Sequence, residues 1–231
     1  MPPNEDALAF LHTAQVHVPT FERLVRDIAP DLRVRHVVRE DLLADARAVG
    51  VDDAGLVARV HHAMHEAASG GATVVVCTCS TIGAVAEQTP AGEAFTAQRI
   101  DRAMADRAVR TGPRVLIVAA LESTLAPTTA LVLSAAQDAG VVVQPRQLLV
   151  EQAWSQFQSG DIAGYVGTLA QAIRAEADGA DGADVVVLAQ ASMAPVEDAL
   201  SDLGIEVLSS PAPGVGLAVK LVGEKYRVSS L

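Results

Sequence analysis

The sequence contains few basic residues, and this shortage narrows the choice of partner. Lys and Arg together number 17 against 28 Asp and Glu, which gives a formal net charge of −11. Binding to phosphates depends on clustered Lys and Arg, so a nucleic acid or an anionic membrane is disfavoured. The expected partner is a small molecule or another protein.

Cysteine is also scarce, since only Cys77 and Cys79 occur, in the order Cys-Thr-Cys. Two residues this close along an extended strand do not suggest a disulfide, and two cysteines are too few for a zinc site. Free thiols fit a reducing compartment, so we expect a cytoplasmic protein.

Several motifs are absent or incomplete. No segment approaches the roughly 20 continuous apolar residues of a membrane span, and residues 1–6 are polar and acidic where a secretory signal would be basic and then apolar. Gly214-Val215-Gly216 lacks the third glycine of a dinucleotide site. The order H-E-x-x-H is missing around His61, His62 and His65, so we expect a solvated helix face there. No membrane, organic cofactor or metal is therefore expected.

The hydrophobic pattern predicts an α/β protein with parallel strands. Short β-branched runs alternate with helical patterns in the order βαβαβ, and this order favours a parallel sheet. The predicted strands cover residues 8–13, 32–38, 73–77, 115–121, 141–143 and 185–188. The predicted helices cover residues 21–28, 42–49, 56–67, 101–110, 130–139 and 151–176, with another after Pro195.

An internal similarity suggests two alike lobes. Residues 73–83 align without gaps on residues 184–194, which puts Cys79 opposite Gln190. A chain of 231 residues can bury two cores of about 100 residues each. We therefore expect two similar lobes, each presenting one turn to a shared cleft.

The turn that contains Cys79 has the features of an active site. It follows a predicted strand and precedes a helix expected from Thr81 onward, where open α/β sheets place ligands. A helix N-terminus would stabilise the thiolate, and the hydroxyls of Ser80 and Thr81 could help to hold a carboxylate or another oxyanion. Gly83 would let backbone or ligand approach. The alternative is that both cysteines are small buried hydrophobes, and for Cys77 we favour it.

Further candidates follow two other predicted strands. His12 and Thr13 come after the first strand, and Ser123 and Thr124 come after the apolar run 115–121, so they would line the same cleft. We expect His12, Thr13 and Thr124 to contact the substrate. His12 could poise or reprotonate the thiol, because imidazole titrates near neutral pH, or it could be a satisfied histidine at a strand end. Thr124 could bind substrate or cap a helix.

Four segments resemble the aspartate/glutamate/hydantoin racemase superfamily. They are C-T-C-S-T-I-G at 77–83, L-A-Q-A-S-M at 188–193, I-D-R-A-M-A-D-R-A-V at 100–109 and L-H-T-A at 11–14. The resemblance covers most of the chain. It implies two pseudo-symmetric α/β lobes, each a parallel sheet flanked by helices, with the active site in the cleft between them and no pyridoxal phosphate. It also implies a small substrate that bears a carboxylate, and a homo-oligomer is open because dimers are common in such proteins.

The predicted lobes are discontinuous. The first comprises residues 1–111 and 209–231 and carries Cys79, and the second comprises residues 112–208 and carries Gln190. The boundary lies at the helix break Thr111-Gly112-Pro113.

The resemblance assigns roles to individual residues. The first-lobe cysteine of the superfamily matches Cys79, and the polar pair that helps to bind the substrate carboxylate matches Ser80 and Thr81. Thr124 lies roughly where the superfamily has a substrate-binding threonine. The second lobe departs from the pattern, because Gln190 replaces the expected cysteine and Ser192 stands where many glutamate racemases have histidine.

This departure leaves the reaction open. Racemisation needs proton transfer on both faces of a carbanion, and the Gln190 amide cannot supply it, although Gln190 can donate a hydrogen bond to a carboxylate. Glu122 is either a second acid/base or an exposed loop residue. We expect an amino-acid racemase or isomerase-like enzyme. A decarboxylase with a single cysteine that protonates one face and a non-catalytic carboxylate-binding protein are the alternatives.

Overall fold

The structure, a computed structural model, describes residues 7–177 and 182–228. Residues 1–6, on which the prediction about a secretory signal depends, lie outside the described residues. The chain divides into two compact units. Unit 1 comprises Met1–Ile100 and Pro211–Leu231, and unit 2 comprises Asp101–Ser210. Within the described ranges, no helix is both long and apolar enough to cross a bilayer.

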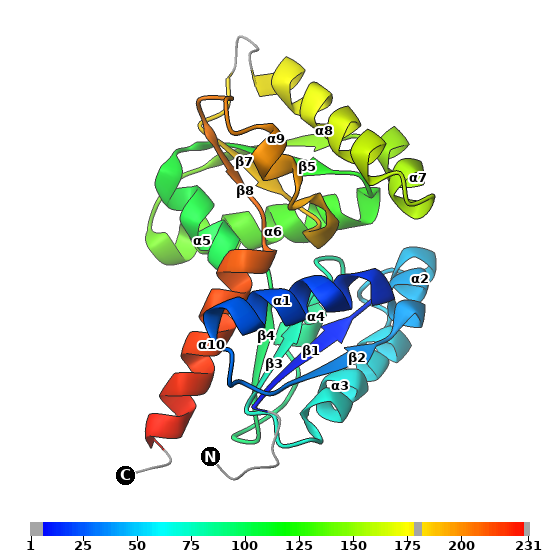
Figure 1. Cartoon of the computed structure of the whole chain (residues 1–231), viewed down its shortest axis with the longest axis vertical. Helices are drawn as coiled ribbons and strands as arrows, with labels where there is room; N and C mark the ends of the chain where they lie inside the picture. Colours follow the sequence, from blue (N-terminus) through cyan, green and yellow to red (C-terminus); the bar gives the residue numbers. More distant parts are fainter. Residues whose placement is uncertain (1–6, 178–181, 229–231) are drawn as a thin grey trace. The chain divides into compact units, whose positions relative to one another are not determined.

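Unit 1 contains a four-stranded parallel sheet in the order β2-β1-β3-β4 (Figure 1). Its strands are β1 (Leu8–His12), β2 (Val34–Val38), β3 (Val74–Cys77) and β4 (Thr96–Arg99). Its helices are η1 (Gln15–His17), α1 (Val18–Ile28), α2 (Glu40–Val49), α3 (Ala54–Ala68), α4 (Gly83–Glu87) and α10 (Pro211–Val228).

Both faces of the unit 1 sheet are buried. Ala9, Val75 and neighbouring side chains on one face pack in a cluster with α2, α3 and α4. On the other face, the Phe10 ring lies 5.2 Å from the ring of Phe21 in α1, and α10 contacts α1, β1 and β3. Strands buried on both sides are continuously apolar, which is why the sequence pattern reveals β1 and β3 so clearly.

Helix α10 approaches the sheet very closely at one glycine. A Cβ atom at Gly214 would overlap the backbone carbonyl oxygen of Ile100. The absence of a side chain at Gly214 therefore brings the C-terminal helix against the end of β4.

Unit 2 repeats this architecture, with a parallel sheet in the order β6-β5-β7-β8. Its strands are β5 (Arg114–Ala119), β6 (Gln144–Leu149), β7 (Val185–Leu188) and β8 (Glu206–Leu208). Its helices are α5 (Arg102–Thr111), α6 (Glu122–Ala139), α7 (Glu151–Gln158), α8 (Ile162–Ala177), η2 (Ala191–Met193) and α9 (Val196–Ala199). One face packs on α5 and α6, and the other on α7, α8 and α9.

The strands β3 and β7 are equivalent, as the internal alignment predicts. The alignment matches Val74–Cys77 with Val185–Leu188, and these ranges are the two strands. Each strand also occupies the third position of its sheet. The predicted α/β fold with two similar parallel sheets is therefore confirmed, and Cys79 and Gln190 occupy the same position after their strands.

The unit boundary differs from the predicted one. Unit 2 begins at Asp101 and ends at Ser210, whereas the break at Thr111-Gly112-Pro113 only separates α5 from β5. The reason is that Met104 and other apolar residues of α5 share a buried cluster with α6.

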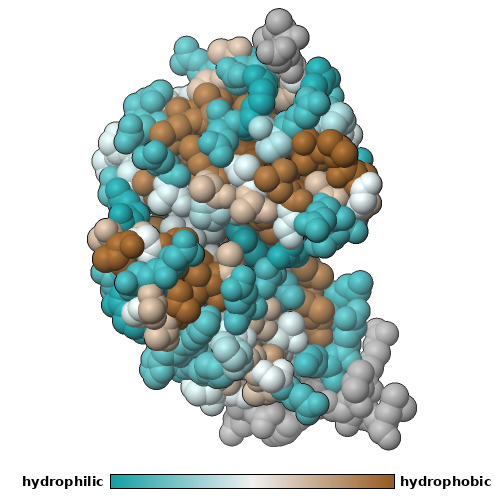
Figure 2. Space-filling view, turned by 180° about the vertical axis from the view of Figure 1, so that it is seen from behind, coloured by the Kyte–Doolittle hydropathy of each residue, from teal (hydrophilic) through white to brown (hydrophobic). Residues whose placement is uncertain are grey.

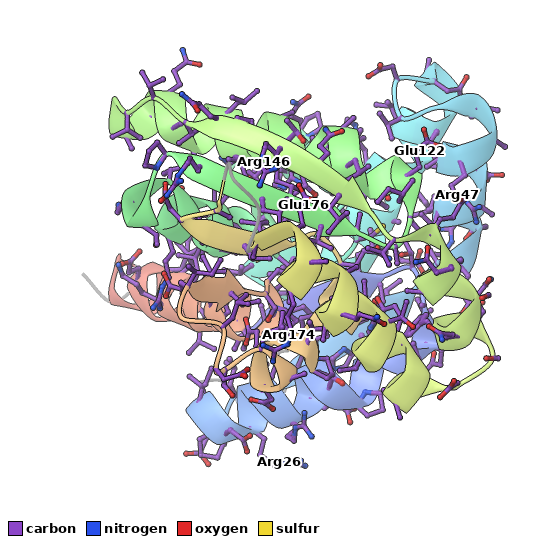
Figure 3. All side chains as sticks on the ribbon, turned by 90° about the horizontal axis from the view of Figure 1, so that it is seen from above. Arg26, Arg47, Glu122, Arg146, Arg174 and Glu176 are labelled. Atoms are coloured by element: carbon purple, nitrogen blue, oxygen red, sulfur yellow. The ribbon has the colours of Figure 1, made fainter. Side chains whose placement is uncertain are left out.

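The strand predicted at residues 141–143 is wrong. Helix α6 ends at Ala139 and is capped by Gly140, whose φ of 67° is left-handed, and Val142 is 84% exposed. The strand β6 begins at Gln144 and contains Pro145, which an edge strand tolerates. Its Arg146 Nη1 donates to Glu176 Oε1 of α8 over 2.6 Å (Figure 3). The polar sequence of this edge strand explains why the hydrophobic pattern does not predict it, and the same applies to β4.

Hydrophobic residues also occur at the surface, in separate groups between hydrophilic ones on the face drawn in Figure 2. Exposed apolar side chains are ordinary on folded proteins, so these groups do not by themselves indicate a binding surface.

Candidate active site

The turn after β3 holds the two thiols in different environments. Cys77 is fully buried, as predicted, and its Sγ–H donates to the Cys79 carbonyl oxygen over 3.7 Å. Cys79 is partly exposed and lies beyond the last residue of the strand. Of the two thiols, therefore, only that of Cys79 has access to a ligand.

The residues that follow Cys79 are polar and buried. Ser80 is 5% exposed and Thr81 is 2% exposed. The Thr81 Oγ1 atom has no hydrogen-bond partner within the part of the chain that the structure describes. An unpaired buried hydroxyl is costly, so Thr81 is available to a polar ligand.

The helix predicted from Thr81 begins later. Helix α4 starts at Gly83 and has only 5 residues, and Ser80 to Ile82 form a turn. A helix this short and this far along the chain does not give Cys79 the expected helix N-terminus. Gly83 instead leaves room for the buried side chain of Arg99, whose Nε would lie 3.2 Å from a Cβ at that position.

Of the two roles left open for His12, the structure favours the satisfied histidine at a strand end over the proton donor. It is 0% exposed, its Nδ1 lies 2.9 Å from Thr78 Oγ1, and its Nε2 lies 2.8 Å from His36 Nδ1. Burial, followed by the charges of His36 and His17, lowers the pKa of His12 from 6.5 to about 3. His12 is thus a neutral, fully bonded histidine at a strand end. The adjacent Thr13 is also buried and stays a candidate for substrate binding.

The lowered pKa values of His12, His17 and His36 predict that the protein loses stability on mild acidification. Burial also lowers the pKa of His17 and His36, so all three imidazoles bind protons more readily in the unfolded chain. The stability contributed by His12 is present above pH 6.5 and is lost as the pH falls toward about 3. We expect the free energy of unfolding, measured in urea, to fall by about 2 kcal/mol between pH 7 and pH 5 from His12 alone.

A His12→Gln variant should shrink this pH difference by a similar amount, even if the variant is less stable at every pH. The exposed His62→Gln variant is the matched control and should leave the difference unchanged. An equal fall in the wild type and in His12→Gln would contradict the assignment. Carboxylates titrate mainly below this pH window and contribute little to it.

Gln190 lies in unit 2 at the position equivalent to Cys79. Its Oε1 accepts hydrogen bonds from the backbone N–H groups of Ala120, over 2.7 Å, and Leu121, over 3.1 Å. These bonds join the end of β7 to the end of β5 and fix the orientation of the amide. The Nε2 group is thereby left as a hydrogen-bond donor, which agrees with the predicted role in binding a carboxylate.

Ser192 is paired with a tyrosine that the sequence pattern did not single out. The hydroxyl of Ser192 lies 2.9 Å from that of Tyr165 in α8, which is 0% exposed. Burial raises the pKa of Tyr165 to about 12, and the hydrogen bond with Ser192 opposes this shift in part. Tyr165 therefore stays neutral and orients Ser192.

The residues after β5 form the first turn of α6. The Thr124 Oγ1–H donates to the Leu121 carbonyl over 2.6 Å, so Thr124 is not the N-cap, a position that Leu121 occupies. The Ser123 Oγ is buried without a partner in the described part of unit 2. Glu122 is exposed at the start of α6 rather than in a loop (Figure 3). Thr124 can still accept a hydrogen bond from a substrate.

Two of the three α3 histidines, His62 and His65, are exposed, in agreement with the predicted solvated face, and His61 is partly buried. His61 Nε2 lies 3.2 Å from the Val85 carbonyl oxygen, and the His65 ring packs edge-on against Phe95. In the described ranges, no group of three or more His, Cys, Asp or Glu side chains could hold a metal ion.

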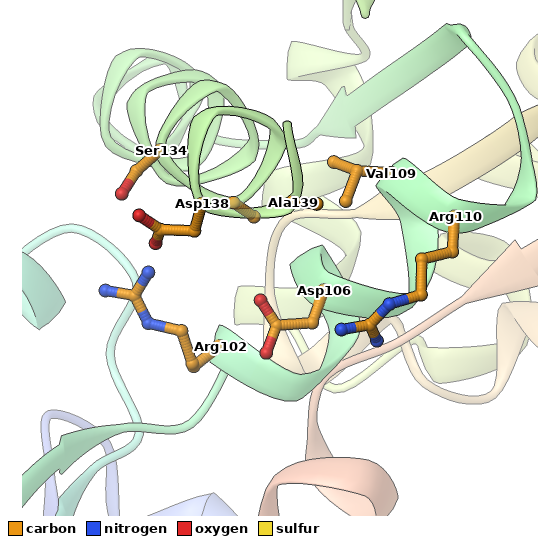
Figure 4. A pocket seen from close by; sticks show the side chains of 8 residues that line it. Arg102, Asp106, Val109, Arg110, Ser134, Asp138 and Ala139 are labelled. Atoms are coloured by element: carbon orange, nitrogen blue, oxygen red, sulfur yellow. The ribbon is translucent and has the colours of Figure 1, made fainter. Parts of the chain in front are cut away.

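A pocket of about 390 Å³ lies between α5 and α6 in unit 2. Figure 4 shows the guanidinium of Arg102 facing Asp138 and that of Arg110 beside Asp106. Charges of opposite sign alternate around this pocket, and its lining contains no thiol. It is therefore not the site of the predicted chemistry.

Each unit thus gathers its candidates at the carboxyl edge of its sheet. Unit 1 places Cys79, Ser80 and Thr81 after β3, next to Thr13 after β1, because β1 and β3 are paired. Unit 2 places Gln190 after β7 and Thr124 after β5, which are paired in the same way.

Comparison with known proteins identifies the fold. Neither a family model nor a curated protein matches the chain by sequence. Among solved structures, the aspartate racemase of Picrophilus torridus is 15% identical with a TM-score of 0.67, over 98% of this chain and 100% of that one.

Two further structures show the same fold. A glutamate racemase from Francisella tularensis, solved in complex with D-glutamate, is 14% identical with a TM-score of 0.70, over 96% of this chain and 82% of that one. A mutant arylmalonate decarboxylase is 18% identical with a TM-score of 0.55, over 94% of this chain and 93% of that one. The chain therefore shares its architecture with enzymes of more than one reaction type.

Proposed function

Since the chain has the fold of the aspartate/glutamate/hydantoin racemase superfamily, we propose that it is a cofactor-independent enzyme acting on a small carboxylate through the Cys79 thiol. The supporting observation is the turn after β3, where a partly exposed thiol precedes two buried hydroxyl residues and Thr81 Oγ1 lacks a partner in the described structure. The reacting atom of the substrate is the carbon alpha to its carboxylate.

The proposed step is proton transfer at this carbon. The Cys79 thiolate removes the α-proton, the electrons of the C–H bond move into the carboxylate, and the thiol returns a proton to the same face of the carbon. This step alone exchanges the α-hydrogen with solvent, and inversion of the carbon would need a second proton donor on the opposite face. The hydroxyls of Ser80 and Thr81 hold the carboxylate oxygens. Gln190 is the equivalent residue of unit 2, and its Nε2 is a donor for a carboxylate or an enediolate oxygen.

The amide at Gln190 favours a second candidate reaction. Its Oε1 is occupied by two backbone N–H groups, and an amide cannot remove or return a proton at neutral pH. Chemistry on one face needs only one thiol. In a decarboxylase, the bond from the α-carbon to one carboxylate breaks, CO₂ leaves, and the Cys79 S–H protonates the enediolate, after which water reprotonates the thiolate.

An NMR screen in D₂O tests the proposal. Amino acids, hydantoins and substituted malonates are incubated with the full chain, and the α-proton signal, optical purity and CO₂ release are followed, with Cys79→Ala as control. Exchange with racemisation supports the racemase. Exchange with full retention of optical purity rules out the racemase and leaves one-face chemistry, while CO₂ release selects the decarboxylase.

A binding-only result would overturn the enzymatic proposal. Saturable binding of a carboxylate by both the wild type and Cys79→Ala, without exchange or CO₂ release in either, would identify a carboxylate-binding protein. The proposed chemistry requires a reduced thiol, and for this reason the proposal includes a cytoplasmic location.

A further inference from the structure

A buried chain of hydrogen bonds leads from β2 to the residue before Cys79. It runs from His36 Nδ1 to His12 Nε2 over 2.8 Å, and from His12 Nδ1 to Thr78 Oγ1 over 2.9 Å. The Thr78 hydroxyl then donates to the Leu11 carbonyl oxygen over 3.3 Å. The chain therefore links β2 and β1 to Thr78, the residue that follows β3 and precedes Cys79, and ends at the Leu11 carbonyl oxygen of β1.

The direction of the donors in this chain can be deduced. The Thr78 hydroxyl uses its one proton toward Leu11, so its oxygen accepts from the Nδ1–H of His12. Neutral His12 then has a bare Nε2, which accepts from the Nδ1–H of His36. The His36 Nε2 is left as an unpaired acceptor, and it is buried without a partner in the described residues. The opposite direction would leave a buried N–H unpaired there, which is rarer in proteins.

Packing fixes the rings of this chain. The His12 ring lies 5.1 Å from the His36 ring and 5.8 Å from the Phe10 ring in stacked arrangements, and 5.3 Å from Phe21 of α1. His12 and Thr78 are 0% and 4% exposed. Neither side chain can turn away without leaving a buried polar atom unpaired.

Thr78 is held twice by the same carbonyl group. Its backbone N–H donates to the Leu11 oxygen over 3.0 Å, in addition to the hydroxyl. Cys79 follows directly, and no strand pairing holds it. The direction of the Cα–Cβ bond of Cys79 thus depends on how Thr78 is fixed, and a misplacement of about 1 Å can cost a hundredfold in rate.

We propose that His12 and Thr78 are positioning residues that hold the Cys79 turn in the geometry for proton transfer. This inference rests on the proposed function, because it assigns a role within the same site. It gives His12 a task different from the one expected from the sequence, since the imidazole acts through Thr78 and exchanges no proton with substrate.

The test compares Thr78→Val, which removes the hydroxyl at nearly constant shape, with Thr78→Ser, which restores it. We expect Thr78→Val to lower kcat about 30-fold with KM changed less than twofold. We also expect it to raise the rate of Cys79 alkylation by iodoacetamide about fivefold and to speed amide hydrogen exchange over residues 77–82. Thr78→Ser should be within threefold of the wild type in every measurement.

Thr89→Val is the matched control for stability. Thr89 is another buried threonine of unit 1, and its Oγ1 donates to the Ala86 carbonyl over 2.7 Å, without contact to the His12 chain. Loss of the Thr89 hydroxyl should lower the melting temperature about as much as loss of the Thr78 hydroxyl does. It should leave the rate of Cys79 alkylation unchanged. Equal alkylation rates in Thr78→Val, Thr89→Val and the wild type would overturn the positioning role.

Two readouts separate this inference from the proposed function. Alkylation of Cys79 needs no substrate. A protein that shows no turnover but still shows the expected alkylation rates would contradict the proposed enzymatic function and still support the positioning role of Thr78. Long-range ¹H–¹⁵N spectra should show His12 protonated at Nδ1. Protonation of His12 at Nε2 would contradict the deduced donor direction and would overturn the proposed series of hydrogen bonds from His36 to Leu11.

Discussion

Cys79→Ala should lower kcat/KM by about a thousandfold on whichever carboxylate proves to be the substrate. Removing the group that transfers a proton typically costs between about a hundredfold and ten thousandfold. The side chain is partly exposed beyond the end of β3, so its loss leaves no large cavity and the fold should survive. Steady-state kinetics and a melting curve are measured on the same preparation.

The neighbouring thiol provides the control. Cys77→Ala removes a buried thiol of the same sheet and should keep activity within about tenfold of the wild type, because Cys77 has no access to substrate. If Cys79→Ala retains more than a tenth of the activity, or if Cys77→Ala is the more damaging change, the thiol has been assigned wrongly. Cys79→Ser should be nearly as inactive as Cys79→Ala, since a serine hydroxyl is a far weaker acid than a thiol.

Gln190→Glu is expected to weaken binding of the substrate about a hundredfold while leaving the fold intact. A carboxylate at this position can still accept from the N–H groups of Ala120 and Leu121, which now meet an even stronger acceptor. It cannot donate, however, and it repels the carboxylate of the substrate. Titration of the ligand and a melting curve separate these two effects.

Two variants sharpen this result. Gln147→Glu makes the same charge change on the exposed edge strand β6 and should leave substrate affinity unchanged. Gln190→Ala leaves two buried N–H groups without acceptors and should destabilise the protein by roughly 2 kcal/mol or more. Unchanged substrate affinity in Gln190→Glu would exclude Gln190 from the site.

The sequence was sufficient to predict most of the architecture, because buried parallel strands carry their signal in composition. The valine runs of β3 and β7 revealed both strands and their equivalence. The edge strands β4 and β6 lack this signal, since one side of each strand is unpaired and polar residues are tolerated there. For this reason the hydrophobic pattern does not predict β6, which contains Pro145 and Arg146. It predicts a strand around Val142 instead, which is apolar but exposed.

Within the candidate site, position along the chain was predictable but hydrogen bonding was not. The place of Cys79 after β3 followed from counting residues. The neutrality of His12 depends on His36, which lies 24 residues further on and becomes a neighbour only when β2 pairs with β1. Tyr165 was missed for the same reason, because its contact with Ser192 spans 27 residues.

The nesting of unit 2 within unit 1 has a consequence for synthesis on the ribosome. Unit 2 is one continuous segment, Asp101–Ser210, and all of it is synthesised before α10. Unit 1 begins earlier but is complete only when α10 contacts α1, β1 and β3 and Gly214 meets Ile100. Domains fold as units during synthesis, usually from the N-terminus. A released chain truncated after Ser210 therefore contains all of unit 2 but lacks α10, so unit 2 should resist protease while the unit that carries Cys79 stays incomplete.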